Sequence, residues 1–159
     1  MGLFSKLLKS KNMIYSPLNG TVISLAEIND GVFSSGMLGN GCGIQPNEET
    51  VYAPCDGEII MVADTGHAIG LTSDEGIEIV IHIGLDTVSM KGQGFHSLVK
   101  QGDKVVTGQE LLTFSNDAIK SAGFSNIVAV LITNSQNYKK IQLVKTGKIY
   151  HSEQLIKLE

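Results

Sequence analysis

Short runs of alternating apolar and polar residues, separated by glycine-centred turns, recur along the chain. The clearest run is Ile77–Ile83, in which an isoleucine at every second position alternates with Glu78, Val80 and His82. This period of two residues predicts a strand whose isoleucines face a core and whose His82 faces outward. Few stretches of the chain show the 3.6-residue period of a helix, so the pattern predicts an all-β domain of many short strands.

Helices are expected to be few and short. The candidates are Leu3–Lys9 near the N-terminus, a turn near Gln93–Lys100, and Ser115–Ala122. None of these segments has the sustained apolar periodicity of a core helix.

A second strand precedes Ile77–Ile83, and the two form a predicted hairpin. The segment His67–Thr72 is strand-like, and Ser73–Gly76 has the composition of a turn. If Asp74 and Glu75 are the two loop residues, His67 lies directly opposite His82, with Cβ atoms roughly 4.5–5.5 Å apart. A slip of one residue would place the two rings on opposite faces. The two facing imidazoles, framed by Ile69, Leu71 and Val80, are the candidate site.

An internal repeat refines the fold prediction. YSPLNGTVI (residues 15–23) returns as YAPCDGEII (residues 52–60), with proline before Asn19-Gly20 or Asp56-Gly57. Each Asn/Asp-Gly pair is a hairpin signal, and Val99–Phe114 contains a third glycine hairpin. The expected fold is an antiparallel β-sandwich, or barrel-sandwich, with an internally duplicated motif and few short helices.

Composition excludes several classes. The 159 residues suggest one domain, residues 13–159, preceded by a tail of residues 1–12. A net charge of −4 with only 12 basic residues argues against a nucleic-acid partner. Cys42 and Cys55 have neither disulfide-framework nor zinc-knuckle spacing, so buried, reduced thiols in a cytosolic protein are expected. No apolar run reaches the roughly 18 residues of a membrane span.

The order of the motifs resembles that of a known family. YSPLNG, residues 31–46, YAPCDG, TGHAI, VIHIGLDTV, KGQGF and VKQGDKVVTGQ occur in the order found in the glucose-family enzyme IIA domain of the phosphoenolpyruvate-dependent sugar phosphotransferase system. The resemblance covers the chain from Tyr15 to the C-terminus, and the HIGLDTV run is its most specific part.

This resemblance implies a cytoplasmic phosphocarrier that needs no cofactor. His82 would accept a phosphoryl group from the protein HPr and pass it to the cysteine of a sugar-specific IIB domain attached to a membrane permease. A neutral imidazole suits this role, because it is nucleophilic near pH 7 and remains a reactive donor once phosphorylated. His67 could hydrogen-bond the phosphate oxygens, and Thr65 could fix the His67 tautomer. The carbonyl of Gly84, or another backbone group, could hold the far nitrogen of His82.

The resemblance also implies a docking face beside the histidines. Apolar residues in the glycine-rich segment before Gly39 would receive HPr and IIB, and two acidic residues would pair with basic groups of these partners. The expected partner-binding residues are Asp30, Val32, Phe33, Met37, Leu38, Ile69, Val80, Asp86 and Val88. The chain departs from better-known enteric members at Ser35-Gly36, Ala63 and Val80, so partner affinity is expected to differ.

Three rival functions have weaker support. A zinc peptidase of the lysostaphin type would match His82-x-x-x-Asp86, but it also needs an H-x-H pair that His96 and His151 do not provide. A biotinyl or lipoyl carrier would have methionine or alanine where Gly92 follows Lys91. The intact His67/His82 pair argues against a regulatory protein without phosphotransfer. Zinc between these two histidines is expected only as an adventitious ion.

The N-terminal tail has two interpretations. Leu3, Phe4, Leu7 and Leu8 share one helical face, with lysines near the other, which resembles a short interfacial helix for an anionic membrane. Such a helix has under three turns, so residues 1–11 would make only weak membrane contact, and a disordered tail is equally compatible with this sequence.

Overall fold

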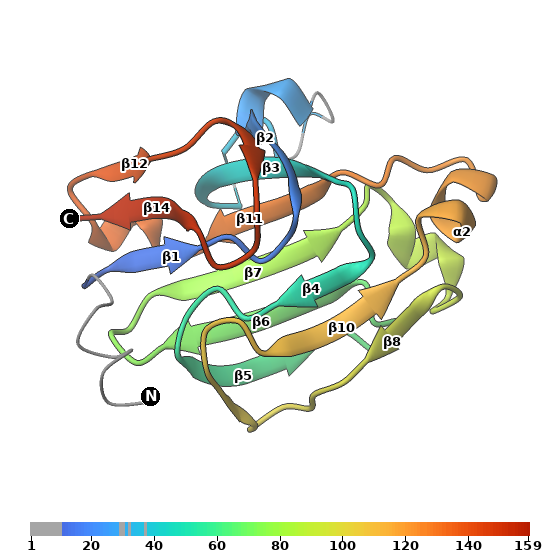
Figure 1. Cartoon of the computed structure of the whole chain (residues 1–159), viewed down its shortest axis with the longest axis horizontal. Helices are drawn as coiled ribbons and strands as arrows, with labels where there is room; N and C mark the ends of the chain where they lie inside the picture. The colour runs from blue at the N-terminus through green and yellow to red at the C-terminus, as the bar shows by residue number, and fades with distance from the viewer. Residues whose placement is uncertain (1–10, 29–30, 32, 37) are drawn as a thin grey trace.

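The protein is an open β-sandwich in a computed structural model, which describes residues 11–28, 31, 33–36 and 38–159. Within these residues, an eight-stranded sheet in the order β13-β2-β3-β11-β7-β6-β5-β9 is accompanied by two three-stranded sheets, β1-β14-β12 and β4-β10-β8 (Figure 1). Every strand pair is antiparallel. The all-β sandwich expected from the sequence is confirmed.

The elements are short, as the closely spaced turns predicted. The strands are β1 (Met13–Tyr15), β2 (Gly20–Ser24), β3 (Asn40–Pro46), β4 (Thr50–Tyr52), β5 (Gly57–Val62), β6 (Ala68–Ser73), β7 (Glu78–Ile83), β8 (Phe95–Ser97), β9 (Lys104–Val105), β10 (Glu110–Phe114), β11 (Val128–Ile132), β12 (Ile141–Leu143), β13 (Gly147–Ile149) and β14 (Gln154–Leu158). Among the described residues, the helices are the 3-10 turns η1 (Leu25–Ile28), η2 (Thr87–Met90) and η3 (Ser135–Asn137) and the α-helix α2 (Asn116–Ser121). In the described part of the chain, no helix combines the length and apolar character needed to cross a membrane.

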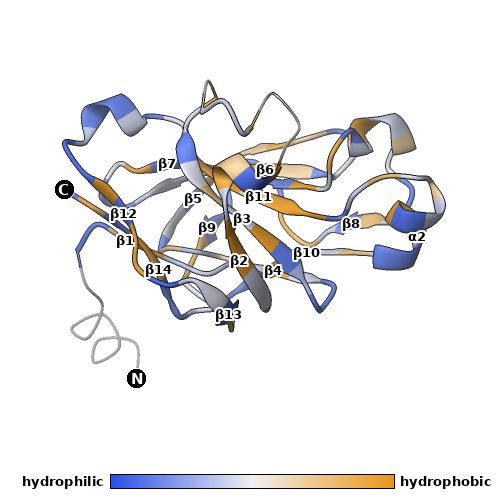
Figure 2. Ribbon diagram, turned by 90° about the horizontal axis from the view of Figure 1, so that it is seen from above, coloured by the Kyte–Doolittle hydropathy of each residue, from blue (hydrophilic) through white to orange (hydrophobic). Residues whose placement is uncertain are grey.

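The main apolar core lies between the sheets, and strands from all three sheets contribute to it. Figure 2 shows hydrophobic residues gathered along the inner strands and hydrophilic residues at many of the turns. The predicted alternation of β7 is confirmed: Ile79, Ile81 and Ile83 are buried, while Glu78 is exposed and His82 is half-buried. The strand therefore presents His82 on the face opposite the core.

The internal repeat joins its two copies by reciprocal hydrogen bonds. The N–H of Tyr15 donates to Pro54 O, and the N–H of Tyr52 donates to Pro17 O, both at 2.8 Å. Each copy also binds a later turn through its Asn or Asp side chain. Asn19 Oδ1 accepts from the N–H of His151 at 2.6 Å, and Asp56 Oδ1 accepts from the N–H of Thr107 at 2.8 Å. The two copies of the repeat therefore make equivalent contacts in the two halves of the molecule.

The prediction that these copies form hairpins is wrong. β1 pairs with β14, whereas β2, after Asn19-Gly20, pairs with β3 and β13. β4 and β5 are likewise separated into different sheets. Each Asn/Asp-Gly pair therefore carries the chain from one sheet to another. The third predicted hairpin also fails, because β9 pairs with β5 and β10 pairs with β4 and β8.

The predicted register of the β6–β7 hairpin is wrong by one residue. Ala68, and not His67, lies opposite His82. The loop has three residues, since the N–H of Ser73 donates to Ile77 O and the N–H of Gly76 donates to Ser73 O. Gly76 adopts a φ of +92°, which suits the left-handed position of a three-residue hairpin loop.

The changed register moves Ile69 into the core. Ile69 pairs with Ile81 and is fully buried, as is Leu71, so neither can frame the histidines or contact a partner, and the prediction for Ile69 is wrong. His67 lies in the bend before β6, so its side chain does not follow the alternation of that strand. Its carbonyl still accepts from the N–H of Ile83 at 2.7 Å, which keeps it beside the end of β7.

The helix predictions have mixed outcomes. Ser115–Ala122 is confirmed as α2, whose N-cap is Ser115: the side chain accepts from the N–H of Ala118 at 3.1 Å. The helical turn near Gln93–Lys100 is wrong, because this segment contains β8, and Gly94 ahead of the strand has a φ of +87°, outside the helical region. Leu3–Lys9 lies outside the described residues.

Candidate functional site

His82 projects from the middle of the eight-stranded sheet. Its neighbours across the ladder are Ala68 on β6 and Ala129 on β11, whose small side chains leave room for the ring. Phe33 packs beside it, with ring centroids 5.1 Å apart at 56°. His82 Nδ1 lies 2.9 Å from Gly84 O.

The contact with Gly84 determines which ring nitrogen of His82 carries the proton. A carbonyl oxygen only accepts, so Nδ1 must be the donor and the lone pair of the neutral ring is on Nε2. Gly84 has a φ of +78°. A Cβ at this position would lie 2.4 Å from Thr87 Cγ2 and 2.9 Å from Ser125 O, so this turn requires glycine.

His67 faces His82 although the two are not paired across the ladder. The ring centroids are 4.9 Å apart at an interplanar angle of 76°, and the ring centroid of Phe95 lies 6.5 Å from that of His67. Thr65 Oγ1 lies 2.5 Å from His67 Nδ1. With 8% of its surface exposed, His67 is largely shielded from water. The predicted convergence of the histidines is therefore present, but it depends on the bend at His67.

Burial, and then the nearby charge of His82, lower the pKa of His67 below its ordinary value. Both effects act against the charged form, so the neutral ring predominates at pH 7. The unfolded chain takes up this proton at a higher pH than the folded chain does. Any stability cost from His67 is therefore absent at high pH and appears as the pH falls through the ordinary histidine range.

We expect an NMR titration to show a pKa for His67 below the ordinary histidine range. In His82→Asn, which removes the charge of His82 but retains a polar side chain, the His67 midpoint should rise yet remain depressed, because burial is the larger cause. The measurement is the pH dependence of the ring Cε1–H shift. A wild-type midpoint at or above the ordinary value would contradict this electrostatic description.

The predicted partner-binding residues differ in their placement. Phe33 is buried against His82, whereas Leu38 and Val88 are 48% and 55% exposed and Asp86 is exposed. Val80 is half-buried on the outward face of β7, two residues from His82. Ile69 belongs to the core, and Asp30, Val32 and Met37 lie outside the described residues.

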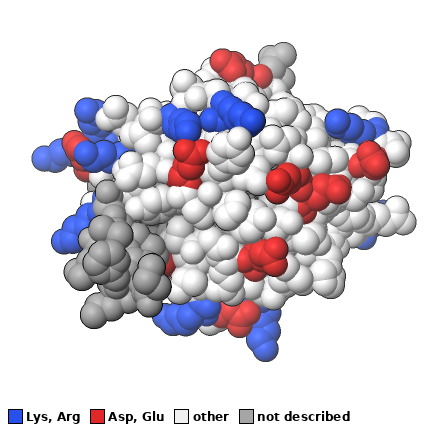
Figure 3. Space-filling model, viewed as in Figure 1, with Lys and Arg blue, Asp and Glu red and all other residues white. Residues whose placement is uncertain are grey.

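The described residues contain no group of three or more His, Cys, Asp or Glu side chains placed to hold a metal ion. On the face drawn in Figure 3, the lysines of the described chain are scattered among acidic and uncharged residues.

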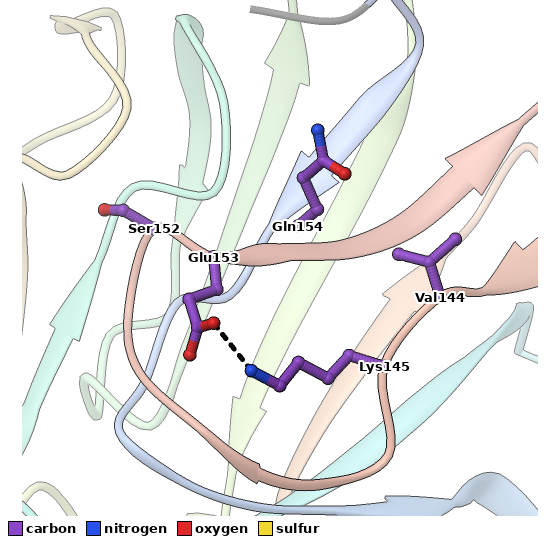
Figure 4. A pocket seen from close by; sticks show the side chains of 5 residues that line it. All are labelled: Val144, Lys145, Ser152, Glu153 and Gln154. Atoms are coloured by element: carbon purple, nitrogen blue, oxygen red, sulfur yellow. Dashed lines mark hydrogen bonds and ion pairs between the residues drawn. The ribbon is translucent and has the colours of Figure 1, made fainter.

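A separate hollow of about 440 Å³ is lined by Val144, Lys145, Ser152, Glu153 and Gln154 (Figure 4). Its acidic residue, Glu153, has a structural role. Glu153 accepts from Lys145 Nζ at 2.6 Å and from the N–H of Tyr150 at 2.7 Å. Gln109 accepts from the N–H of Val106 in the same way, at 3.3 Å, in the related turn of the other half of the molecule. Glu153 thus closes a turn.

Sequence reasoning missed the residues that hold the Gly84 turn. Thr87 is fully buried and its Oγ1 donates to Ile83 O at 2.5 Å. Ser125 and Ile127, some forty residues further along the chain, accept hydrogen bonds from the same turn. Thr87 lies within the HIGLDTV run, but no local signal indicated the segment containing Ser125.

Comparison with known proteins identifies the group to which these features belong. The profile of the phosphoenolpyruvate-dependent sugar phosphotransferase system, EIIA 1, matches residues 12–138. The chain is 44% identical over 149 residues to a beta-glucoside-specific EIIBCA component of Bacillus subtilis, covering 94% of the chain and 24% of that protein. It is 43% identical over 124 residues to a glucose-specific EIIA component of Halalkalibacterium halodurans, covering 78% and 72%.

A solved structure shares the fold. Glucose permease IIA from Mycoplasma capricolum matches with a TM-score of 0.85 at 35% identity, covering 91% of this chain and 93% of that one. The chain spans about a quarter or less of the multidomain EIIBCA and EIICBA relatives.

Proposed function

The chain belongs to the EIIA 1 family of the phosphoenolpyruvate-dependent sugar phosphotransferase system, as its resemblance to the glucose-family IIA domain predicted, and from this premise we propose which groups carry the phosphoryl group. His82 accepts it on Nε2 from phospho-HPr and passes it to the cysteine of a sugar-specific IIB domain, in the cytoplasm. The observation that carries the proposal is the hydrogen bond from His82 Nδ1–H to Gly84 O, because it puts the nucleophilic lone pair on Nε2.

Each transfer exchanges one bond to phosphorus for another. In the first, His82 Nε2 forms a bond to phosphorus as the bond to the HPr histidine breaks. In the second, the thiolate of the IIB cysteine forms a bond to phosphorus, and the electron pair of the breaking P–N bond returns to Nε2. Such reactions depend mainly on alignment and on stabilising charge at the equatorial oxygens. No further reactant is required.

His67 supplies that stabilisation in this proposal. If Thr65 donates to Nδ1 of the neutral ring, the remaining proton of His67 is on Nε2 and can be donated to a phosphoryl oxygen. Because its pKa is lowered, His67 is neutral before phosphate arrives and does not repel the basic residues of an approaching partner. The negative charge of the phosphoryl group would then favour protonation of His67.

The surface around His82 provides the docking face. Phe33 beside the ring, exposed Leu38 and Val88, and half-buried Val80 form the apolar part among the described residues, and Asp86 supplies a negative charge. We assign the contacts with HPr and IIB to these residues, together with Asp30, Val32 and Met37. An acidic rim residue of this kind mainly affects orientation and association rate.

The proposal is tested by incubating the chain with phosphoenolpyruvate, enzyme I and HPr. The intact mass should increase by one phosphoryl group, and acid treatment should remove it, since phosphohistidine is acid-labile. Leaving out HPr provides the control. A mass that stays unchanged in the complete mixture would overturn the proposed function.

We expect phosphorylation to survive exhaustive chelation. Two converging histidines provide fewer protein ligands than catalytic zinc usually takes. The measurement is the phosphorylation rate before and after EDTA, with magnesium restored for enzyme I. Activity that disappears with EDTA and returns only with zinc would instead favour the zinc-peptidase class.

A further inference from the structure

A glycine turn beside His82 is held by hydrogen bonds on both of its peptide units. The first unit joins Ile83 to Gly84: Ile83 O accepts from Thr87 Oγ1 at 2.5 Å, and the Gly84 N–H donates to Ile127 O at 2.9 Å. The second unit joins Gly84 to Leu85, whose N–H donates to Ser125 O at 3.0 Å. Each unit therefore has a fixed plane.

The second unit directly orients the group that binds His82. In a trans peptide the C=O and the following N–H point in opposite directions from one plane. With the Leu85 N–H directed at Ser125 O, the Gly84 C=O is directed away from Ser125, and His82 Nδ1 lies 2.9 Å from it. The position of Ser125 thus controls the acceptor that sets the tautomer of His82.

Asn126 lies between the two residues whose carbonyls hold the turn. It is 5% exposed, and its side chain is bonded at both ends. Its Oδ1 accepts from Gln45 Nε2 at 2.8 Å, and its Nδ2 donates to Asn116 Oδ1 at 2.8 Å. Asn116 is anchored in turn, because its N–H donates to Glu49 Oε2 at 2.8 Å. This network connects β3 and the start of α2 to residues 125–127.

We propose that Asn126 is a positioning residue for phosphoryl transfer: its buried side chain fixes the Ser125–Ile127 segment, whose two carbonyls fix both peptide units of Gly84 and thereby keep His82 in the Nδ1–H tautomer. Thr87 holds the first of these units from the opposite side. The inference rests on the proposed function, since it explains how Nε2 of His82 is kept as the attacking atom. It adds residues remote from the histidines in sequence.

The chain offers a matched control in Asn134. This second buried asparagine, 8% exposed, accepts from the N–H of Glu78 and donates to Gly76 O, both at 3.0 Å. It therefore holds the opposite end of the same strand, β7. Asn126→Ala and Asn134→Ala both remove a buried side-chain amide that makes two hydrogen bonds, so they should destabilise the fold to a similar degree. Only the first alters the support of Gly84.

The experiment has two readouts. In the unphosphorylated protein, ring ¹⁵N shifts report the tautomer of His82; in the phosphorylated protein, ³¹P NMR distinguishes a phosphoryl group on Nε2 from one on Nδ1. We expect Asn126→Ala to populate both tautomers of His82. Its phosphorylation rate should fall about tenfold, equivalent to one neutral hydrogen bond, with an unchanged KM for phospho-HPr. Asn134→Ala should retain the wild-type tautomer, isomer and rate.

Further outcomes decide between interpretations. If Asn126→Ala does not fold, Thr87→Val removes the hydroxyl at nearly constant shape and should shift the tautomer in the same direction, whereas Thr87→Ser should not. If the folded Asn126→Ala protein keeps the wild-type tautomer, the inference is overturned. If Asn126→Ala does not fold, a wild-type tautomer in Thr87→Val overturns it instead. An equal loss of rate in Asn134→Ala would also overturn it. Failure of the wild type to accept phosphate would contradict the proposed function alone, because the tautomer measurement needs no phosphate.

Discussion

His82→Ala is expected to reduce phosphate acceptance from phospho-HPr below detection. In the proposed function this variant lacks the imidazole that forms the bond to phosphorus. The neighbouring His67 cannot replace it, because with Thr65 donating to Nδ1 its Nε2 carries the proton and has no lone pair to attack with. The fold should be retained, since the ring faces outward from β7. Intact mass after incubation with the donor proteins measures the first effect, and circular dichroism with equilibrium unfolding measures the second.

His96→Ala provides the control for this variant. His96 is exposed on β8, pairs with Thr113 and takes no part in the histidine pair, so its removal should leave phosphorylation unchanged. Labelling that persists in His82→Ala, at His67 or any other residue, would contradict the assignment of His82 as the nucleophile.

His67→Gln is expected to accept phosphate from HPr but to pass it to IIB on the order of 10²–10³ times more slowly, the usual loss when one charge-stabilising contact is removed. Glutamine retains a hydrogen-bond donor but cannot acquire a positive charge as negative charge develops on the phosphoryl oxygens. Single-turnover transfer in both directions, measured for wild type and variant, separates the two steps.

His151→Gln is the matched substitution for this second experiment. His151 stacks on Tyr52 with ring centroids 3.7 Å apart, in a different part of the sandwich, and should tolerate glutamine without loss of transfer. Equal rates of transfer to IIB in wild type and His67→Gln would mean that His67 is only a structural neighbour of His82.

The local pattern of the chain determines a good part of this protein. The alternation of isoleucines along Ile77–Ile83 determines which side of β7 is buried, because side chains in a strand point to opposite faces in turn. The hydroxyl of Ser115 determines where α2 begins. The order of the motifs determines the family, which the comparisons confirm. Each of these features depends on neighbouring residues or on the linear order of the chain.

Only the tertiary structure decides how these pieces meet. A three-residue loop at Asp74–Gly76 shifts the register and places Ile69 in the core, although the same residues are equally compatible with a two-residue loop. At each Asn/Asp-Gly pair the chain passes from one sheet to another, because the flanking strands pair with strands far away in the sequence, as β1 does with β14. His67 reaches His82 from a bend outside the strand.

The support of His82 is the most non-local feature of all. The sequence predicts His82 and the acceptor at Gly84, since they are two residues apart within one motif. The carbonyls of Ser125 and Ile127 approach that turn only because β11 lies beside β7 in the sheet. Backbone carbonyls occur at every residue, so no sequence pattern distinguishes these two. Strand order alone makes them part of the site.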